Sequence, residues 1–100
     1  HDSAASSSAN GFGVFHFNAW TSNAAKLIES RTVNKGVYSR NRGTSWHYFF
    51  LARASYCPSV LTENGYMNGS HDANGIVSAA VNSQKARAIA EGIVDYFASY

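Results

Sequence analysis

The sequence predicts a single α/β domain with a mostly parallel central sheet flanked by helices. Three observations support this fold class. A chain of 100 residues has room for one small domain. Short apolar runs typical of buried strands alternate with two segments whose apolar residues recur every three or four positions. The order strand, helix, strand, strand, helix fits a layered α/β arrangement, and no internal repeat or domain boundary interrupts it.

The first half of the chain predicts one strand, one helix and a loop. Residues 12–19 form an apolar run that indicates a strand. Residues 22–34 predict a helix with Ser22 as its N-cap, because the apolar side chains recur on one face. Residues 34–47 are rich in Asn, Gly, Ser and Arg, so we expect a polar loop there.

Two more strands and a second helix are expected in the other half. Residues 48–52 and 59–63 are apolar and predict strands, whereas residues 64–75 contain three Asn-Gly pairs and predict turns. Residues 82–98 predict a helix that begins near Asn82 or Ser83. Gly92 lies inside this helix, where a missing side chain would allow close packing on the sheet.

Composition argues against two classes of function, nucleic-acid binding and a membrane-spanning protein. The formal charge is only +2 and 14% of residues are charged, which is too little positive charge for a dedicated nucleic-acid binder. No run approaches the roughly 20 apolar residues of a membrane span, and the start of the chain has no signal-peptide pattern. Cys57 is the single cysteine, so we expect a small buried apolar residue rather than a disulfide or a cysteine zinc site.

Two side chains at strand ends are candidates for chemistry. Glu63 ends the apolar run before Asn-Gly, and His16 lies near the end of the first strand. Open α/β sheets keep their chemistry at the carboxyl ends of core strands, so this pair suggests a metal ligand and a general base. Two simpler interpretations stay open: His16 as a satisfied core or edge residue, and Glu63 as a turn cap or an ion-pair partner of an arginine.

Two junctions look too short for this fold. The chain passes from the first strand through Trp20 to Ser22 and into a helix almost directly, and residues 3–12 enter the first strand through Ser and Ala. Parallel strands need crossovers of about a dozen residues or more. We therefore expect either a very compressed fold or absent segments.

At this point three motifs resemble a known family. FHFNAW at residues 15–20, RNRG at 40–43 and PSVLTENGYM at 58–67 are similar, in this order, to segments of the zinc-dependent N-acetylmuramoyl-L-alanine amidases of type 3, which include autolysins and phage endolysins. The resemblance implies an α/β catalytic domain over residues 1–100. It further implies that Zn²⁺ is the cofactor, that His16 is a zinc ligand and that Glu63 is the catalytic acid/base.

The implied substrate is peptidoglycan, cleaved between the lactyl group of N-acetylmuramic acid and L-alanine. Such an enzyme would be secreted to the cell wall, or encoded by a phage and released there at lysis. It would have no nucleic-acid partner and would not be embedded in a membrane. The resemblance does not indicate an oligomeric state.

The sequence also departs from the family pattern. His1 resembles the first zinc ligand, but the Glu ligand expected after it is absent, as is the strand expected after Trp20. These differences fall near residues 3–11 and 20–22, where we expect segments to be missing. A non-catalytic cell-wall binding relative, or another zinc-dependent peptide or amide hydrolase, therefore remains an alternative.

Overall fold

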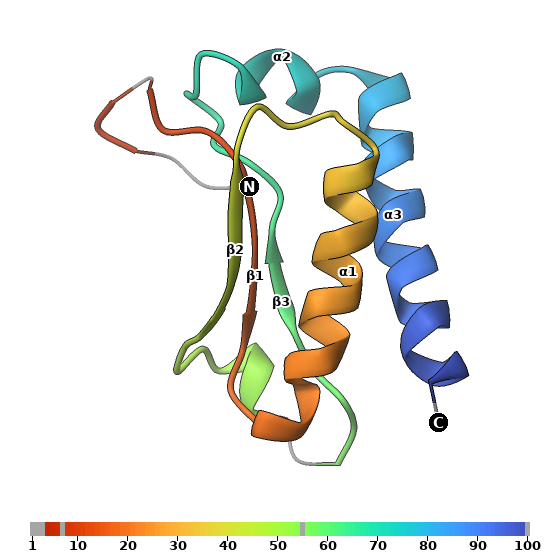
Figure 1. Ribbon diagram of the computed structural model, residues 1–100. Helices are drawn as coiled ribbons and strands as arrows, with labels where there is room; N and C mark the ends of the chain where they lie inside the picture. The colour runs from red at the N-terminus through yellow and green to blue at the C-terminus, as the bar shows by residue number, and fades with distance from the viewer. Residues whose placement is uncertain (1–3, 7, 55, 100) are drawn as a thin grey trace.

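The structure of the chain, a computed structural model, describes residues 4–6, 8–54 and 56–99 (Figure 1). Three strands, three helices and two 3₁₀ turns (η) are found in these residues: β1 (Phe12–His16), η1 (Ala19–Thr21), α1 (Ser22–Asn34), β2 (Asn41–Trp46), η2 (Leu51–Arg53), β3 (Leu61–Glu63), α2 (Asp72–Ile76) and α3 (Ala79–Ala98). The α/β fold class is confirmed.

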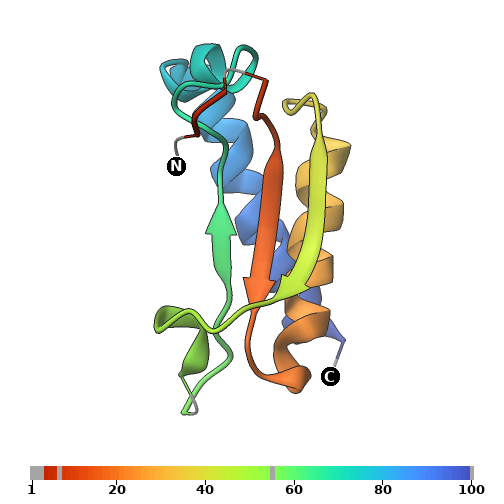
Figure 2. The same cartoon turned by 90° about the vertical axis from the view of Figure 1, so that its left-hand side faces the viewer.

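The sheet is mixed, so the prediction of a mostly parallel sheet was wrong. Its order is β2-β1-β3, with β1 parallel to β2 and antiparallel to β3 (Figure 2). The parallel pair is joined by α1, which carries the chain back to the starting end of the sheet, as a right-handed crossover requires. Between β2 and β3 the chain contains only the short turn η2, so it returns along the sheet in the opposite direction.

The helices cover one face of the sheet, and the core lies between them and β1. In Figure 1, α1 and α3 both lie to the right of the strands. Phe12 and Val14 point to this side and pack with Ala25 and Ile28 of α1, and all four side chains are almost completely buried. We call the opposite side, which faces the viewer in Figure 2, the open face.

Helix α3 packs against α1, and Gly92 marks the contact. A Cβ atom added at Gly92 would lie 2.5 Å from the Cα atom of Ile28. Gly92 therefore does allow a close approach, as predicted, but to the neighbouring helix and not to the sheet.

Several element boundaries differ from the prediction. The bounds of helix α1 and the end of β3 agree with it, but the N-cap of α1 is Thr21 and not Ser22. Strand β2 lies inside the expected loop 34–47, and residues 48–52 form no strand. Helix α3 begins earlier, with Ser78 as an N-cap whose side chain accepts a hydrogen bond from the Val81 amide. Cys57 is exposed rather than buried, because it lies in the loop before β3. None of the helices in the described residues has the length and apolar character needed to cross a membrane.

Candidate active site on the open face

Glu63 lies at the end of β3, on the open face. It is paired with Gly13 of β1, and the neighbouring pair is Val14 with Thr62. Side chains alternate along a strand, so Glu63 and Phe15 point to the open face, while Val14 and Thr62 point towards the helices. Glu63 therefore lies outside the apolar core. The residue directly opposite it is Gly13, which has no side chain.

Arg42 of β2 forms an ion pair with Glu63 across the open face. The Arg42 Nη1 atom donates to Glu63 Oε2 at 2.6 Å, and the two side chains are 21% and 20% exposed. The guanidinium also lies over the ring of Tyr66, 4.9 Å from its centroid. An ion pair requires an ionised carboxylate, which is the form that can accept a proton. The interpretation of Glu63 as an ion-pair partner of an arginine is therefore confirmed. It does not exclude a catalytic role, because the paired carboxylate can still accept a proton.

Asp72 fixes the turn that follows Glu63. Its carboxylate is completely buried, and Oδ2 accepts hydrogen bonds from the amides of Gly11 (2.7 Å) and Tyr66 (3.0 Å). These donors lie just before β1 and just after β3. A Cβ atom at Gly65 would lie 3.0 Å from the same carboxylate oxygen, so glycine leaves room for it. Asp72 thereby ties together the ends of the two paired strands.

Tyr38 and Lys85 complete this support from the helix side. Both donate to the carbonyl oxygen of Asn64, at 3.0 Å from the tyrosine hydroxyl and 3.4 Å from the lysine ammonium. Burial raises the pKa of the Tyr38 hydroxyl well above its usual value, and the charge of Asp72 acts in the same direction. Burial lowers the pKa of Lys85, while Asp72 partly opposes that shift.

His16 is the last residue of β1 and is not close to Glu63. Glu63 pairs with Gly13, three residues before His16, which corresponds to about 10 Å along the strand. Alternation also places His16 on the helix side with Val14. The antiparallel direction of β3 explains the separation, because the carboxyl ends of antiparallel strands lie at opposite ends of a sheet.

The described residues offer part of a zinc site. The His16 Nδ1 atom is buried without a hydrogen-bond partner, which fits an imidazole that binds a metal. Catalytic zinc, however, uses three protein ligands, and no group of three or more His, Cys, Asp or Glu side chains in the described part of the chain is arranged to hold a metal. His1, the other predicted ligand, lies outside the described residues.

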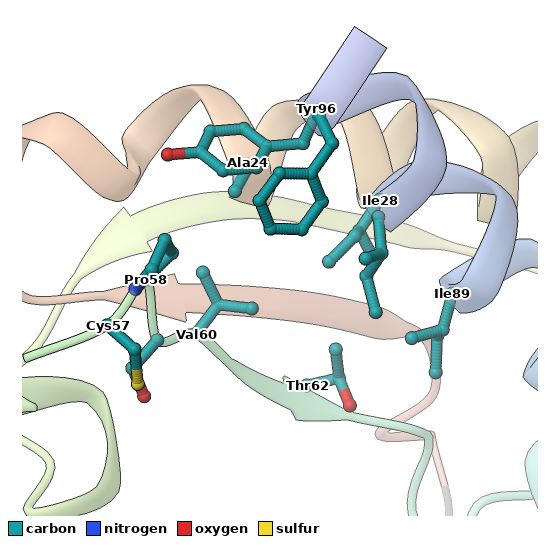
Figure 3. A pocket seen from close by; sticks show the side chains of 11 residues that line it. Ala24, Ile28, Cys57, Pro58, Val60, Thr62, Ile89 and Tyr96 are labelled. Carbon is teal, nitrogen blue, oxygen red and sulfur yellow. The ribbon is translucent and has the colours of Figure 1, made fainter.

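An apolar groove lies behind the sheet, away from Glu63. It has a volume of about 460 Å³ and is formed by β3, the loop before it, and the facing sides of α1 and α3 (Figure 3). Val60, Thr62, Ile28 and Ile89 point into it in the figure. The lining also includes Cys57, Ser59 and Tyr96 but no carboxylate, histidine or lysine, so the groove lacks the acid–base pair that Glu63 could supply on the open face.

Sequence reasoning missed four residues that support Glu63 or the turn after it: Arg42, Asp72, Tyr38 and Lys85. Gly43 directly after Arg42 was an available signal, because such a glycine often marks a bulge in a strand. Asp72 lies in the turn-rich segment 64–75, and its carboxylate accepts hydrogen bonds from the amides of Gly11, distant in sequence, and Tyr66. No local pattern reveals a contact of that kind.

The fold and this carboxylate define the class: an α/β domain with an acid–base candidate on the open face of its sheet. Comparison with known proteins identifies the family. A family profile for N-acetylmuramoyl-L-alanine amidase matches residues 1–95, so the chain belongs to the N-acetylmuramoyl-L-alanine amidase family.

Relatives and solved structures agree with this assignment. The N-acetylmuramoyl-L-alanine amidase LytC of Bacillus subtilis is 27% identical over 95 residues, which are 92% of this chain and 19% of LytC. The probable cell wall amidase LytH of Staphylococcus epidermidis is 29% identical over 99 residues, which are 99% of this chain and 34% of LytH. The solved amidase AmiC2 of Nostoc punctiforme matches with a TM-score of 0.89 and 31% identity, over 96% of this chain and 53% of AmiC2. The chain thus spans about half of that solved structure and a smaller part of the other two relatives.

Proposed function

We propose that the protein containing this chain hydrolyses the amide between the lactyl group of N-acetylmuramic acid and L-alanine in peptidoglycan, with Glu63 as general acid and base. The observation that carries this proposal is the position of Glu63. It ends β3 on the open face of an amidase-family fold, and its carboxylate is held by Arg42 rather than buried in the core. Its place of action would be the cell wall, reached by secretion or by phage release.

The reaction requires Glu63 to accept one proton and then to donate it. The carboxylate accepts a proton from the attacking water while the hydroxyl oxygen bonds to the amide carbon. When the carbon–nitrogen bond breaks, Glu63 returns the proton to the departing amine of L-alanine. The products are a free lactyl carboxylate and a peptide with a free amino terminus.

We further propose that His16 contributes one ligand to a catalytic Zn²⁺, and His1 a second. The unpartnered Nδ1 atom of His16 supports the first assignment. The ion, when bound, would supply a Lewis acid for the scissile carbonyl. His16 and Glu63 lie about 10 Å apart along β1 and point to opposite faces of the sheet, so the described residues do not bring this ligand beside the Glu63 carboxylate. The remaining ligands would come from residues outside the described part of the chain. Replacing His16 by Ala should then lower the zinc content of the purified full-length protein, and an unchanged zinc content would remove His16 from the ligand set.

Product analysis tests the proposed reaction. Incubation of purified peptidoglycan with the full-length protein should release peptides with free L-alanine amino termini, without new reducing sugar ends. Free amino termini at another residue would indicate a different peptide or amide hydrolase. Binding to peptidoglycan without any cleavage would indicate the non-catalytic relative, an alternative favoured by the incomplete set of metal ligands in the described residues.

A further inference from the structure

We propose that Arg42 is a positioning residue for Glu63, a role that rests on the amidase function proposed above. The guanidinium contacts the carboxylate at 2.6 Å through a single oxygen, Oε2. That contact leaves the second oxygen, Oε1, to exchange the proton with water and with the leaving amine. Arg42 itself transfers no proton, because a guanidinium stays protonated at any pH at which proteins fold.

The backbone of β2 is built to direct Arg42 towards Glu63. Phe12 of β1 pairs with Asn41 and the next residue, Gly13, pairs with Gly43, so Arg42 is the extra residue of a β-bulge. Gly43 has a φ of +80°, which is the left-handed region that favours glycine. Its amide donates to the side chain of Asn41 at 2.8 Å, which closes the bulge. A bulge re-aims a side chain, and here it brings Arg42 to the face that carries Glu63.

Aromatic rings then restrict the guanidinium. It lies 4.9 Å from the centroid of Tyr66 and 5.8 Å from that of Phe15, both on the open face. Cation–π contacts of this kind favour a fixed guanidinium plane, and that plane in turn fixes the carboxylate. Because the residue opposite Glu63 is Gly13, no other side chain from that position competes for the carboxylate.

This ion pair differs from the surface network between α1 and α3 in the described residues. Arg31, Lys35 and Arg87 form a charged network with Glu91 and Asp95 on the outside of α1 and α3, far from the open face. Exposed pairs such as the one between Arg31 and Asp95 contribute little to folding stability. The pair of Arg42 and Glu63 is about four-fifths buried, so the orientation that it imposes is retained.

Steady-state kinetics on a soluble muramoyl-peptide provides the test, with the full-length protein in four variants: Arg42→Met, Arg42→Lys, Glu63→Gln and the double variant. Arg42→Met should lower kcat about 10- to 100-fold with little change in KM, since a supporting residue commonly contributes that much. Arg42→Lys should recover part of the loss, because lysine keeps the charge but not the planar geometry. Arg40→Met, at an exposed arginine two residues away, is the matched control and should retain the parent kcat.

The double variant separates positioning from an independent role. If Arg42 acts through Glu63, Arg42→Met should have almost no further effect once Glu63 is Gln. An equal loss in both backgrounds would overturn the inference, as would a parent kcat in Arg42→Met. A parent kcat in Glu63→Gln would instead overturn the proposed function of Glu63. Thermal unfolding of each variant corrects kcat for the folded fraction, so a loss explained by unfolding alone would also contradict a positioning role.

Discussion

At the scale of single residues, Asp72 stabilises the site most directly. Replacing it by Ala removes the acceptor for the amides of Gly11 and Tyr66 and leaves one buried and one half-buried donor unpaired. Each unsatisfied buried group costs about 1–3 kcal/mol, so we expect the free energy of unfolding to fall by about 2–5 kcal/mol. Urea denaturation followed by circular dichroism measures this change.

Asp95→Ala is the matched control for Asp72→Ala. Asp95, on the surface of α3, also accepts two hydrogen bonds. Both come from the exposed guanidinium of Arg31 on α1. Water can replace these bonds, so the loss of stability should be much smaller. Equal losses for the two variants would show that Asp72 has no special role in tying the strand ends together.

Tyr38 makes the free energy of unfolding fall as pH rises in the alkaline range. Its pKa is raised in the folded protein by burial, so above pH 10 the unfolded chain loses the phenolic proton while the folded chain keeps it. The unfolded state then binds fewer protons, and the free energy of unfolding falls as pH rises. Lys85, whose ammonium lies 4.9 Å from the Tyr38 ring, has a lowered pKa and acts in the opposite direction up to about pH 10.5.

Tyr38→Phe isolates the contribution of the tyrosine, because Lys85 and Asp72 remain in both proteins. Between pH 10 and 11.5, the free energy of unfolding should fall less steeply in Tyr38→Phe than in the parent. Tyr56→Phe, at a side chain that is 90% exposed, should follow the parent. Parallel pH profiles for all three proteins would contradict the effect of burial on Tyr38.

At the scale of elements, the contact between α1 and α3 depends on Gly92. The 2.5 Å approach of Ile28 Cα leaves no room for a methyl group, and both atoms belong to packed helices. Gly92→Ala should therefore destabilise the protein by about 1–3 kcal/mol, although alanine is the better helix former. Ser83→Ala, at an exposed position of the same helix, should not be destabilising; a stabilised Gly92→Ala variant would show that the helices can move apart.

The sequence predicted the elements that bury a regular apolar face and missed those that do not. Helix α1, helix α3 and the end of β3 show clear apolar patterns. Strand β2 was missed because its sequence, NRGTSW, is polar and lies at the edge of the sheet. Residues 48–52 are apolar and aromatic, which predicts a strand. They form none, and Tyr48 and Phe49 instead pack edge-on against Phe17 and Phe15.

The candidate site was predictable in part. Glu63 and His16 stood out because each is a polar residue at the end of an apolar run. Their separation was not predictable, since strand direction depends on the connection between β2 and β3 and not on the pattern within a strand. The contact between Arg42 and Glu63 was not predictable either, because it depends on a bulge in the neighbouring strand.

At the scale of the whole molecule, the sheet separates two environments. One face packs on α1 and α3 (Figures 1 and 2) and contains the core. The open face carries Arg42, Glu63 and Tyr66. The chain spans 53% of the solved AmiC2 structure, whose fold it shares. The proposed amidase reaction, with Glu63 transferring the proton on the open face, is consistent with these findings.

The rate of muramoyl-L-alanine amide cleavage by Glu63→Gln, in the full-length protein, tests this account most directly. Glutamine keeps the size of the side chain but cannot accept the proton, so cleavage should fall by at least about 100-fold while the protein stays folded. Glu91→Gln, at a surface acid of α3, should keep the parent rate. A Glu63→Gln protein that cleaves the amide as fast as the parent would contradict the central claim.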